Sequence, residues 1–158
     1  MPFTQSRGGD TGLAQITVEG MRETLQQRRS TMYTKKYKAL EAISNSIGEH
    51  NDCTVKAVAM FCNVRYMTAH KALANLGRVK RRGTNMLYVK AAIESLSGRQ
   101  LVPSWEEIKG HRTPATYVKL TKGKQALVVV RGHIIYMKDG VIHDHDGCNN
   151  RRIQEVLT

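Results

Sequence analysis

Hydrophobic residues in the middle of the chain recur every three or four positions, which is the spacing of amphipathic helices. The clearest case begins at Thr34, where Tyr37 and Leu40 fall on one helical face and Gly48 follows as a C-terminal stop. The same reasoning predicts helices over 17–29, 34–47, 53–62, 65–76 and 84–96, one turn around Trp105, and a short helix over 113–120. The chain before residue 120 is therefore expected to be helical, with Trp105 as a core anchor.

The pattern becomes that of β-strands after Gly123. Residues 126–130 read Ala-Leu-Val-Val-Val, a continuous run that fits a buried strand better than a helix of five residues. Two further apolar stretches, 132–138 and 141–144, flank Asp139-Gly140, a dipeptide typical of two-residue hairpin turns. Helices followed by an antiparallel meander predict an α+β fold.

The hairpin pattern also predicts which side chains share a face. If Asp139-Gly140 is a two-residue turn, Lys138 faces Val141 on the neighbouring strand. Side chains alternate between the two faces of a strand, so every second residue lies on the same side. One face then carries His133, Asp144 and Asp146, and the other carries His143 and His145.

Length and composition fit one domain, because 158 residues can bury one core but not two. We expect a polar N-terminal extension over 1–33, which carries the first amphipathic helix, and a single domain over 34–158. The chain has no apolar run of about eighteen residues and no apolar signal region, so we expect no membrane span and a cytoplasmic protein. The three cysteines, Cys53, Cys62 and Cys148, are then expected to be reduced thiols.

The charge of the chain changes the list of expected partners. Lys and Arg number 25 against 13 Asp and Glu, which gives a net charge of +12 and a surface that attracts polyanions. The densest basic block supplies Arg78, Lys80, Arg81 and Arg82. This block is interpreted either as a solvated loop or as a contact for nucleic acid or an acidic partner protein.

Cys53 occupies a chemically favourable position at the start of a predicted helix. Asn51 or Asp52 is expected to cap this helix, which places Cys53 among the unpaired backbone N–H groups of the first turn. Those groups and the helix dipole favour a thiolate, and they can also stabilise an oxyanion on a carbonyl that the sulfur attacks. The alternative is that Cys53 is simply a small apolar residue at a helix start.

The order of three residues along the chain points to one chemistry. Cys53 at a helix start is followed by His133 on one strand and Asp144 on the next, which is the chain order of papain-like thiol hydrolases. There an imidazole takes the thiol proton and later protonates the leaving group, while a carboxylate fixes the tautomer of the ring.

The surrounding residues resemble the small papain-like cysteine peptidases of bacteriophages and prophages. The resemblance covers about residues 50 to 147, and it rests on the stretch 51–59, Tyr66, Ala69-His70, Leu73, Gly77-Arg78, Gly83-Thr84, Gly132-His133, Asp139-Gly140, Asp144 and Asp146-Gly147. It implies a papain-like cysteine hydrolase domain that cleaves a peptide or amide bond in a protein or peptide substrate, without a cofactor, in the host cytoplasm if the origin is a phage. It also implies Cys53 as nucleophile, His133 as general base and acid, and Asp144 as orienting residue. Asp146, which the two-residue register places directly opposite His133, is the alternative orienting residue.

The chain departs from that family before the cysteine. The family's oxyanion-hole glutamine usually sits several residues upstream, where this chain reads Ile47-Gly48-Glu49-His50. Asn51 is therefore the candidate oxyanion donor, or backbone N–H groups form the hole alone. This departure leaves open an amidase, a transferase or a fold that has lost its catalysis beside a peptidase.

Two other interpretations use overlapping residues. The segment from Ala59 to Gly77 is spaced like a helix-turn-helix, with Asn63 at the turn and Lys71 on a recognition helix, which would make the protein a basic DNA-binding protein with a winged-helix arrangement.

The third interpretation is a metal site. Its potential ligands are His143, Asp144, His145, Asp146 and Cys148, but no Cys-x-x-Cys pair supports a closed zinc centre, so no metal is predicted.

Overall fold

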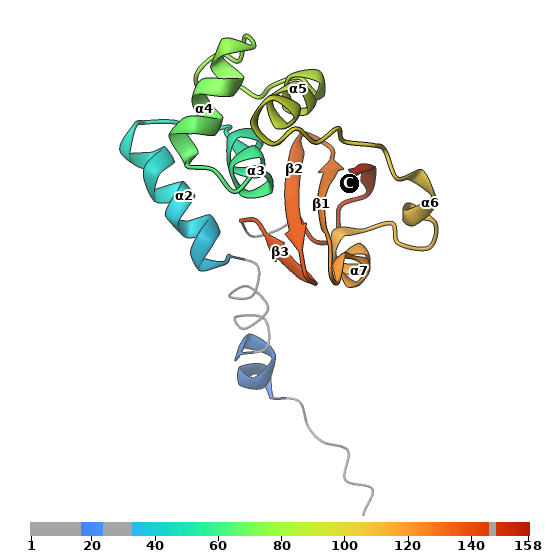
Figure 1. Cartoon of the computed structure of the whole chain (residues 1–158). Helices are drawn as coiled ribbons and strands as arrows, with labels where there is room; N and C mark the ends of the chain where they lie inside the picture. The colour runs from blue at the N-terminus through green and yellow to red at the C-terminus, as the bar shows by residue number, and fades with distance from the viewer. Residues whose placement is uncertain (1–16, 24–32, 146–147) are drawn as a thin grey trace, which may run out of the picture.

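The chain folds as a four-stranded antiparallel sheet with helices packed on both of its faces (Figure 1). This is a computed structural model, and it describes residues 17–23, 33–145 and 148–158. The strands are β1 (Gln125–Val130), β2 (His133–Lys138), β3 (Val141–His143) and β4 (Ile153–Leu157), in the spatial order β3-β2-β1-β4. Helices precede strands, so the predicted α+β class is confirmed.

β2 and β3 form the predicted hairpin in the predicted register. The paired residues are Lys138 with Val141, Met137 with Ile142, and Tyr136 with His143. Asp139 and Gly140 turn the chain with φ of 51° and 77°, the left-handed conformation that a two-residue hairpin of this hand requires. The turn therefore fixes which hairpin side chains share a face.

β1 is an inner strand of the sheet, and this explains its unbroken apolar sequence. Leu127 points into the core beneath the first helices, whereas Ala126 and Val128 belong to a second core on the opposite face. All three are fully buried, because helices cover both faces of the sheet. A strand buried on both faces is expected to be a continuous apolar run, as residues 126–130 are in the sequence.

Four helices cover one face of the sheet and shorter ones cover the other. The first group is α2 (Lys35–Ser46), α3 (Cys53–Phe61), α4 (Tyr66–Asn75) and α5 (Met86–Ser97). The second group is α6 (Trp105–Ile108), α7 (Pro114–Tyr117) and the 3-10 turn η1 (Val118–Thr121). The predicted helices over 34–47, 53–62 and 65–76 match the first group to within a residue or two at each end.

α3 is the central helix of the larger core. It is surrounded by α2, α4, α5 and β2, and every residue from Thr54 to Phe61 is buried. Its apolar sequence has no solvent-facing side, which is the property of a helix enclosed by other elements. Only its first residue, Cys53, stands at the rim of the core, half-buried.

Two of the local predictions were wrong here, and one strand was missed. The cap of α5 is Asn85, whose side chain accepts from the Leu87 N–H, and not Thr84. Trp105 is 59% exposed and anchors no core. β4 was not predicted, because Ile153–Leu157 has only a partial alternation and becomes a strand by pairing with β1 across a register shift.

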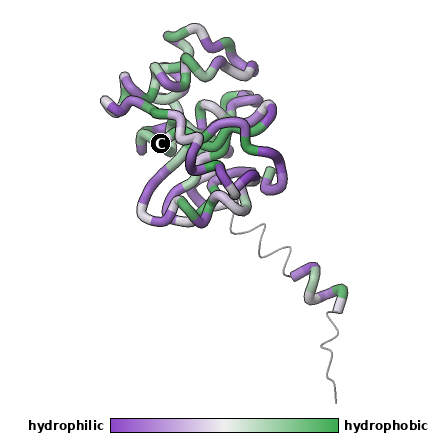
Figure 2. Tube along the Cα trace, turned by 90° about the vertical axis from the view of Figure 1, so that its right-hand side faces the viewer, coloured by the Kyte–Doolittle hydropathy of each residue, from purple (hydrophilic) through white to green (hydrophobic). Residues whose placement is uncertain are grey.

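The N-terminal extension contributes one short helix to the described residues, over 18–23. Val18 and Met21 on it are 69% and 55% exposed, so its apolar side is not covered by the domain. Figure 2 shows this helix apart from the folded body. The rest of the helix predicted over 17–29 lies outside the described residues. Among the described helices, none is long and apolar enough to cross a membrane.

Candidate functional site

Cys53 is the first residue of α3, and Asp52 occupies the N-cap position of this helix. The predicted side-chain cap is absent, because the Asp52 carboxylate turns inward and makes no capping bond. It accepts a hydrogen bond from the Tyr66 hydroxyl at 2.7 Å and pairs with the Lys56 ammonium at 3.1 Å. Burial would raise the pKa of the Asp52 carboxyl, but hydrogen bonds from Ser44, Tyr66 and Lys56 lower it below its ordinary value. This buried carboxylate ties the start of α3 to α4.

His133 is the first residue of β2 and carries the clearest charge-assisted contact of the hairpin. Its Nε2 lies 2.7 Å from Oδ1 of Asp144, the residue that follows β3. The His133 side chain is 8% exposed and that of Asp144 is 1% exposed, so little water competes for this hydrogen bond. The two residues predicted to share a hairpin face are thus in direct contact. Asp146, the alternative orienting residue, lies outside the described residues.

The Cys53 thiol reaches the same imidazole from the helical side. Burial would lower the pKa of His133, but hydrogen bonds to Asp144 and to Cys53 raise it to about 9. Because Nε2 is engaged by Asp144, the second ring nitrogen, Nδ1, is the one left to face the thiol. The structure therefore joins the start of α3 to the hairpin through a single imidazole ring.

Cys53 and His133 together line two hollows. One, of about 520 Å³, is lined mainly by polar and charged residues of α2 and of the loop before α3. The other, of about 310 Å³, is lined partly by the apolar side chains Met86, Val129 and Ile134. Gly83 and Gly132 border both hollows, and a Cβ added at either glycine would meet no atom within 4 Å. An extended substrate could thus pass the thiol with its main chain close to the two glycines.

Asn51, the candidate oxyanion donor, lines the larger of these hollows together with Cys53. It adopts a left-handed conformation with φ of 53°, and its side-chain amide donates to the carbonyl oxygen of Arg81 at 3.3 Å. That contact uses one of the two amide hydrogens, so the second stays available for an oxygen in the hollow. The backbone N–H groups in the first turn of α3 have no intrahelical acceptor and are the other source of donors.

A buried carboxylate that the sequence did not reveal supports the loop in front of Cys53. Glu49 is 3% exposed and accepts hydrogen bonds from His70 at 2.7 Å, from the Arg78 guanidinium at 3.2 Å and from the Arg81 N–H at 2.5 Å. Burial would raise the pKa of the Glu49 carboxyl, but these partners lower it to about 2. They lie 21 to 32 positions away along the chain, and no local spacing signals such contacts.

Residues of the basic block help to hold the loop in front of Cys53, and this changes the role expected for the block. Arg78 is buried against Glu49, so its guanidinium is not on a surface that a polyanion could contact, and that part of the binding prediction is wrong. Lys80 and Arg81 are exposed but donate to the carbonyl oxygens of Ile47 and Gly48. Arg82 is exposed as well. These three side chains remain candidates for contact with nucleic acid or an acidic partner.

The potential metal ligands that come together in the structure differ from the set that the sequence suggested. His143 faces α2, where its Nδ1 lies 2.8 Å from the Thr34 hydroxyl. His133, Asp144, His145 and Cys148 instead come together, with one ligand atom from each lying within 4.8 Å of all the others. The alternation rule separated His143 from Asp144 correctly, but it did not foresee that the chain after β3 brings His145 back towards His133.

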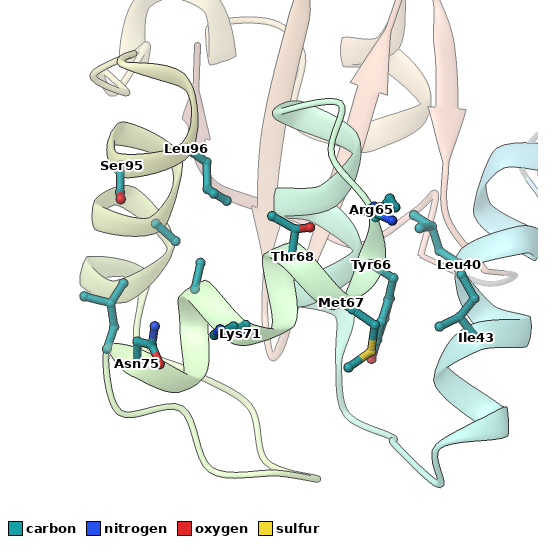
Figure 3. A pocket seen from close by; sticks show the side chains of 13 residues that line it. Leu40, Ile43, Arg65, Tyr66, Met67, Thr68, Lys71, Asn75, Ser95 and Leu96 are labelled. Carbon is teal, nitrogen blue, oxygen red and sulfur yellow. The ribbon is translucent and has the colours of Figure 1, made fainter.

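A hollow of about 920 Å³ lies away from this chemistry, among α2, α4 and α5 (Figure 3). Apolar side chains of Leu40, Met67 and Leu96 line much of it, with Arg65 and Lys71 among its polar residues. Among the residues that the structure describes, no cysteine, histidine or carboxylate borders it. Its size alone therefore gives it no catalytic role.

Comparison with known proteins found no matching family model, no matching curated protein and no matching solved structure. Function must therefore be argued from the residues of the site.

Proposed function

We propose that the protein is a papain-like thiol hydrolase that cleaves a peptide or amide bond with Cys53, His133 and Asp144. The observation that carries this proposal is the shared imidazole: His133 is hydrogen-bonded to Asp144 at 2.7 Å, and Cys53 lies beside the same ring, lines the same two hollows and raises its pKa. Nucleophile, base and orienting carboxylate are then in the order that the chemistry needs. A helical half that presents the cysteine to an antiparallel sheet is also consistent with a papain-like arrangement.

The contacts assign a role to each group. His133 takes the thiol proton, and Cys53 Sγ forms a bond to the substrate carbonyl carbon, which turns the carbonyl oxygen into an oxyanion. N–H groups of the first turn of α3, with Asn51 beside them, would bind that oxyanion. The C–N bond then breaks as His133 returns the proton to the leaving amine, and water hydrolyses the thioester. Asp144 holds the ring so that Nδ1 faces the sulfur throughout.

The alkylation rate of Cys53 as a function of pH tests this proposal first. With iodoacetamide and site-resolved mass spectrometry, we expect wild-type Cys53 to react quickly already near about pH 6, well below the pKa of about 8.5 of a free thiol. In His133→Ala the fast reaction at low pH should disappear, because no imidazolium remains to stabilise a thiolate. His143→Ala is the matched control, since that ring contacts Thr34. A wild-type profile like that of a free thiol would refute the triad.

The stability of the protein should fall as the pH rises through the range in which His133 loses its proton. The pKa of His133 is raised from 6.5 to about 9 in the folded state, so its contribution is complete below about 6.5 and is lost as the pH approaches 9. We expect the wild type to lose up to about 3 kcal/mol more unfolding free energy over this range than His133→Gln. Urea denaturation at several pH values measures the difference, and parallel curves for the two proteins would contradict the raised pKa.

A basic DNA-binding protein remains the alternative function. The turn between α3 and α4 contains Asn63 with φ of 53°, and Lys71 is exposed on α4, as a helix-turn-helix would need. This alternative gives no role to the contact between Cys53 and His133. A DNA binder should lose salt-dependent affinity for DNA in Lys71→Ala and Arg82→Ala and keep that affinity in Cys53→Ala. A thiol hydrolase should lose its activity in Cys53→Ala and keep it in Lys71→Ala and Arg82→Ala.

A further inference from the structure

The side chains of two histidines, one aspartate and one cysteine converge at the end of the hairpin. His133, Asp144, His145 and Cys148 each offer a ligand atom, and these atoms all lie within 4.8 Å of one another. In a tetrahedral zinc site with bonds of 2.0 to 2.3 Å, the ligand atoms are about 3.3 to 3.8 Å apart. To enclose a metal, the widest of these separations must shorten by about an ångström, and His133 Nε2 and Asp144 Oδ1, which are 2.7 Å apart, must move slightly apart as their hydrogen bond breaks.

The donor set and its surroundings suit Zn²⁺. Two imidazoles, one thiolate and one carboxylate are ligands that zinc accepts, whereas magnesium and calcium prefer oxygen alone. Cys148 is 1% exposed and is packed in the core under the sheet, and the His145 ring lies against the His133 ring with centroids 4.7 Å apart. The ligands are therefore held by the hairpin and the core, and one of them, His145, is exposed, so a metal ion can enter from solvent.

The second carboxylate oxygen of Asp144 gives independent support for a cation-binding site. Asp144 Oδ1 accepts from His133 and the Cys148 thiol also interacts with this carboxylate, but the buried Oδ2 finds no N–H or O–H donor among the residues that the structure describes. A buried carboxylate oxygen without a partner is unfavourable, and a bound divalent cation would satisfy it.

We propose that His133, Asp144, His145 and Cys148 bind Zn²⁺, and that the metal switches the thiol hydrolase off. Binding forms a Zn–Sγ bond at Cys148 and releases its thiol proton to solvent. If the metal takes the lone pair of His133 Nε2, the proton of the neutral ring must sit on Nδ1, the nitrogen that faces Cys53. Such a ring cannot accept the thiol proton. The inhibitory half of this inference rests on the proposed function, whereas the metal site itself does not.

Binding is tested on the full chain with Zn²⁺ and Co²⁺. We expect one Zn²⁺ per chain in competition with a chromogenic chelator, and a thiolate-to-cobalt charge-transfer band with Co²⁺. Cys148→Ser should abolish that band, and both Cys148→Ser and His145→Asn should weaken Zn²⁺ binding by at least about tenfold. His143→Asn and Cys62→Ser are matched controls outside the cluster and should bind as the wild type does. Because His145 is exposed, His145→Asn keeps the test valid if Cys148→Ser fails to fold.

The position of the metal relative to the nucleophile is tested with Cys53→Ala, which should bind Zn²⁺ as tightly as the wild type. If Cys53→Ala loses the metal while Cys148→Ser keeps it, zinc binds across Cys53 and His133 instead, and the proposed site is wrong. Wild-type affinity in both Cys148→Ser and His145→Asn would also overturn it.

Inhibition is measured as the alkylation rate of Cys53 with and without saturating Zn²⁺. We expect zinc to slow that rate by at least about tenfold in the wild type and to leave it unchanged in Cys148→Ser. If zinc binding depends on Cys148 and His145 while Cys53 in the metal-free protein reacts like a free thiol, the metal site is supported and the proposed thiol hydrolase function is refuted. A fast Cys53 in a protein that binds no zinc would refute the site alone.

Discussion

Replacing Asp144 with asparagine is expected to slow acylation of Cys53 by about 10²- to 10⁴-fold while the protein stays folded. Asp144 is 1% exposed, and its Oδ1 accepts a hydrogen bond from His133 Nε2. An asparagine of the same shape that presents its NH₂ group there forces Nε2 to become the acceptor. The ring proton then moves to Nδ1, and the base faces the thiol with no lone pair to offer.

The release of nitrophenolate from a p-nitrophenyl ester measures this acylation rate, in a chelating buffer so that metal binding does not contribute. Asp139→Asn is the matched control, because Asp139 lies on the same hairpin, and asparagine tolerates its φ of 51°. Circular dichroism and thermal unfolding verify that both variants fold. An Asp144→Asn protein that is acylated as fast as Asp139→Asn would remove Asp144 from the proposed triad.

Truncating Glu49 to alanine is expected to lower the free energy of unfolding by about 3–5 kcal/mol. The Glu49 side chain is fully buried, and its loss leaves the Arg78 guanidinium, 1% exposed, without its carboxylate. The Arg81 N–H loses its acceptor as well, so the loop that carries Gly83 towards Cys53 loses its support. We therefore expect Cys53 alkylation to respond too, although Glu49 does not touch the thiol.

Chemical denaturation measures the effect of Glu49→Ala, with Glu106→Ala as its control. Glu106 pairs with Lys109 on the surface with 84% of its side chain exposed, and its loss should change stability by no more than about 0.5 kcal/mol. In Glu49→Leu/Arg78→Met both charges are removed, and much of the stability should return, because no buried charge is left alone. Equal losses in the single and double variants would contradict this explanation.

The same carboxylate sets the acid limit of the fold. The pKa of Glu49 is lowered from 4.5 to about 2 in the folded protein, so its contribution is complete above about 4.5 and is lost as the pH falls towards 2. The wild type should therefore lose stability over this acid range, whereas Glu49→Gln should lose less. The sign is opposite to that of His133, whose contribution is lost at high pH.

The sequence by itself determined the helices, the inner strand and the hairpin. These depend on residues close together along the chain: the helical spacing of apolar positions, the run at 126–130, and the Asp139-Gly140 turn. Because strand side chains alternate, the turn also placed His133 and Asp144 on one face, and the structure has them in contact. The same local reasoning failed for β4, which becomes a strand only by pairing with β1.

Only the tertiary structure decided how the chemical groups meet. Cys53 and His133 are brought together by the packing of α3 against β2, and Glu49 joins Arg78 because two loops distant along the chain fold together. The collection of His145 and Cys148 around His133 depends on the path of the chain after β3. The energies that fix such contacts come from burial and desolvation, which are properties of the assembled core, and no short stretch of sequence contains them.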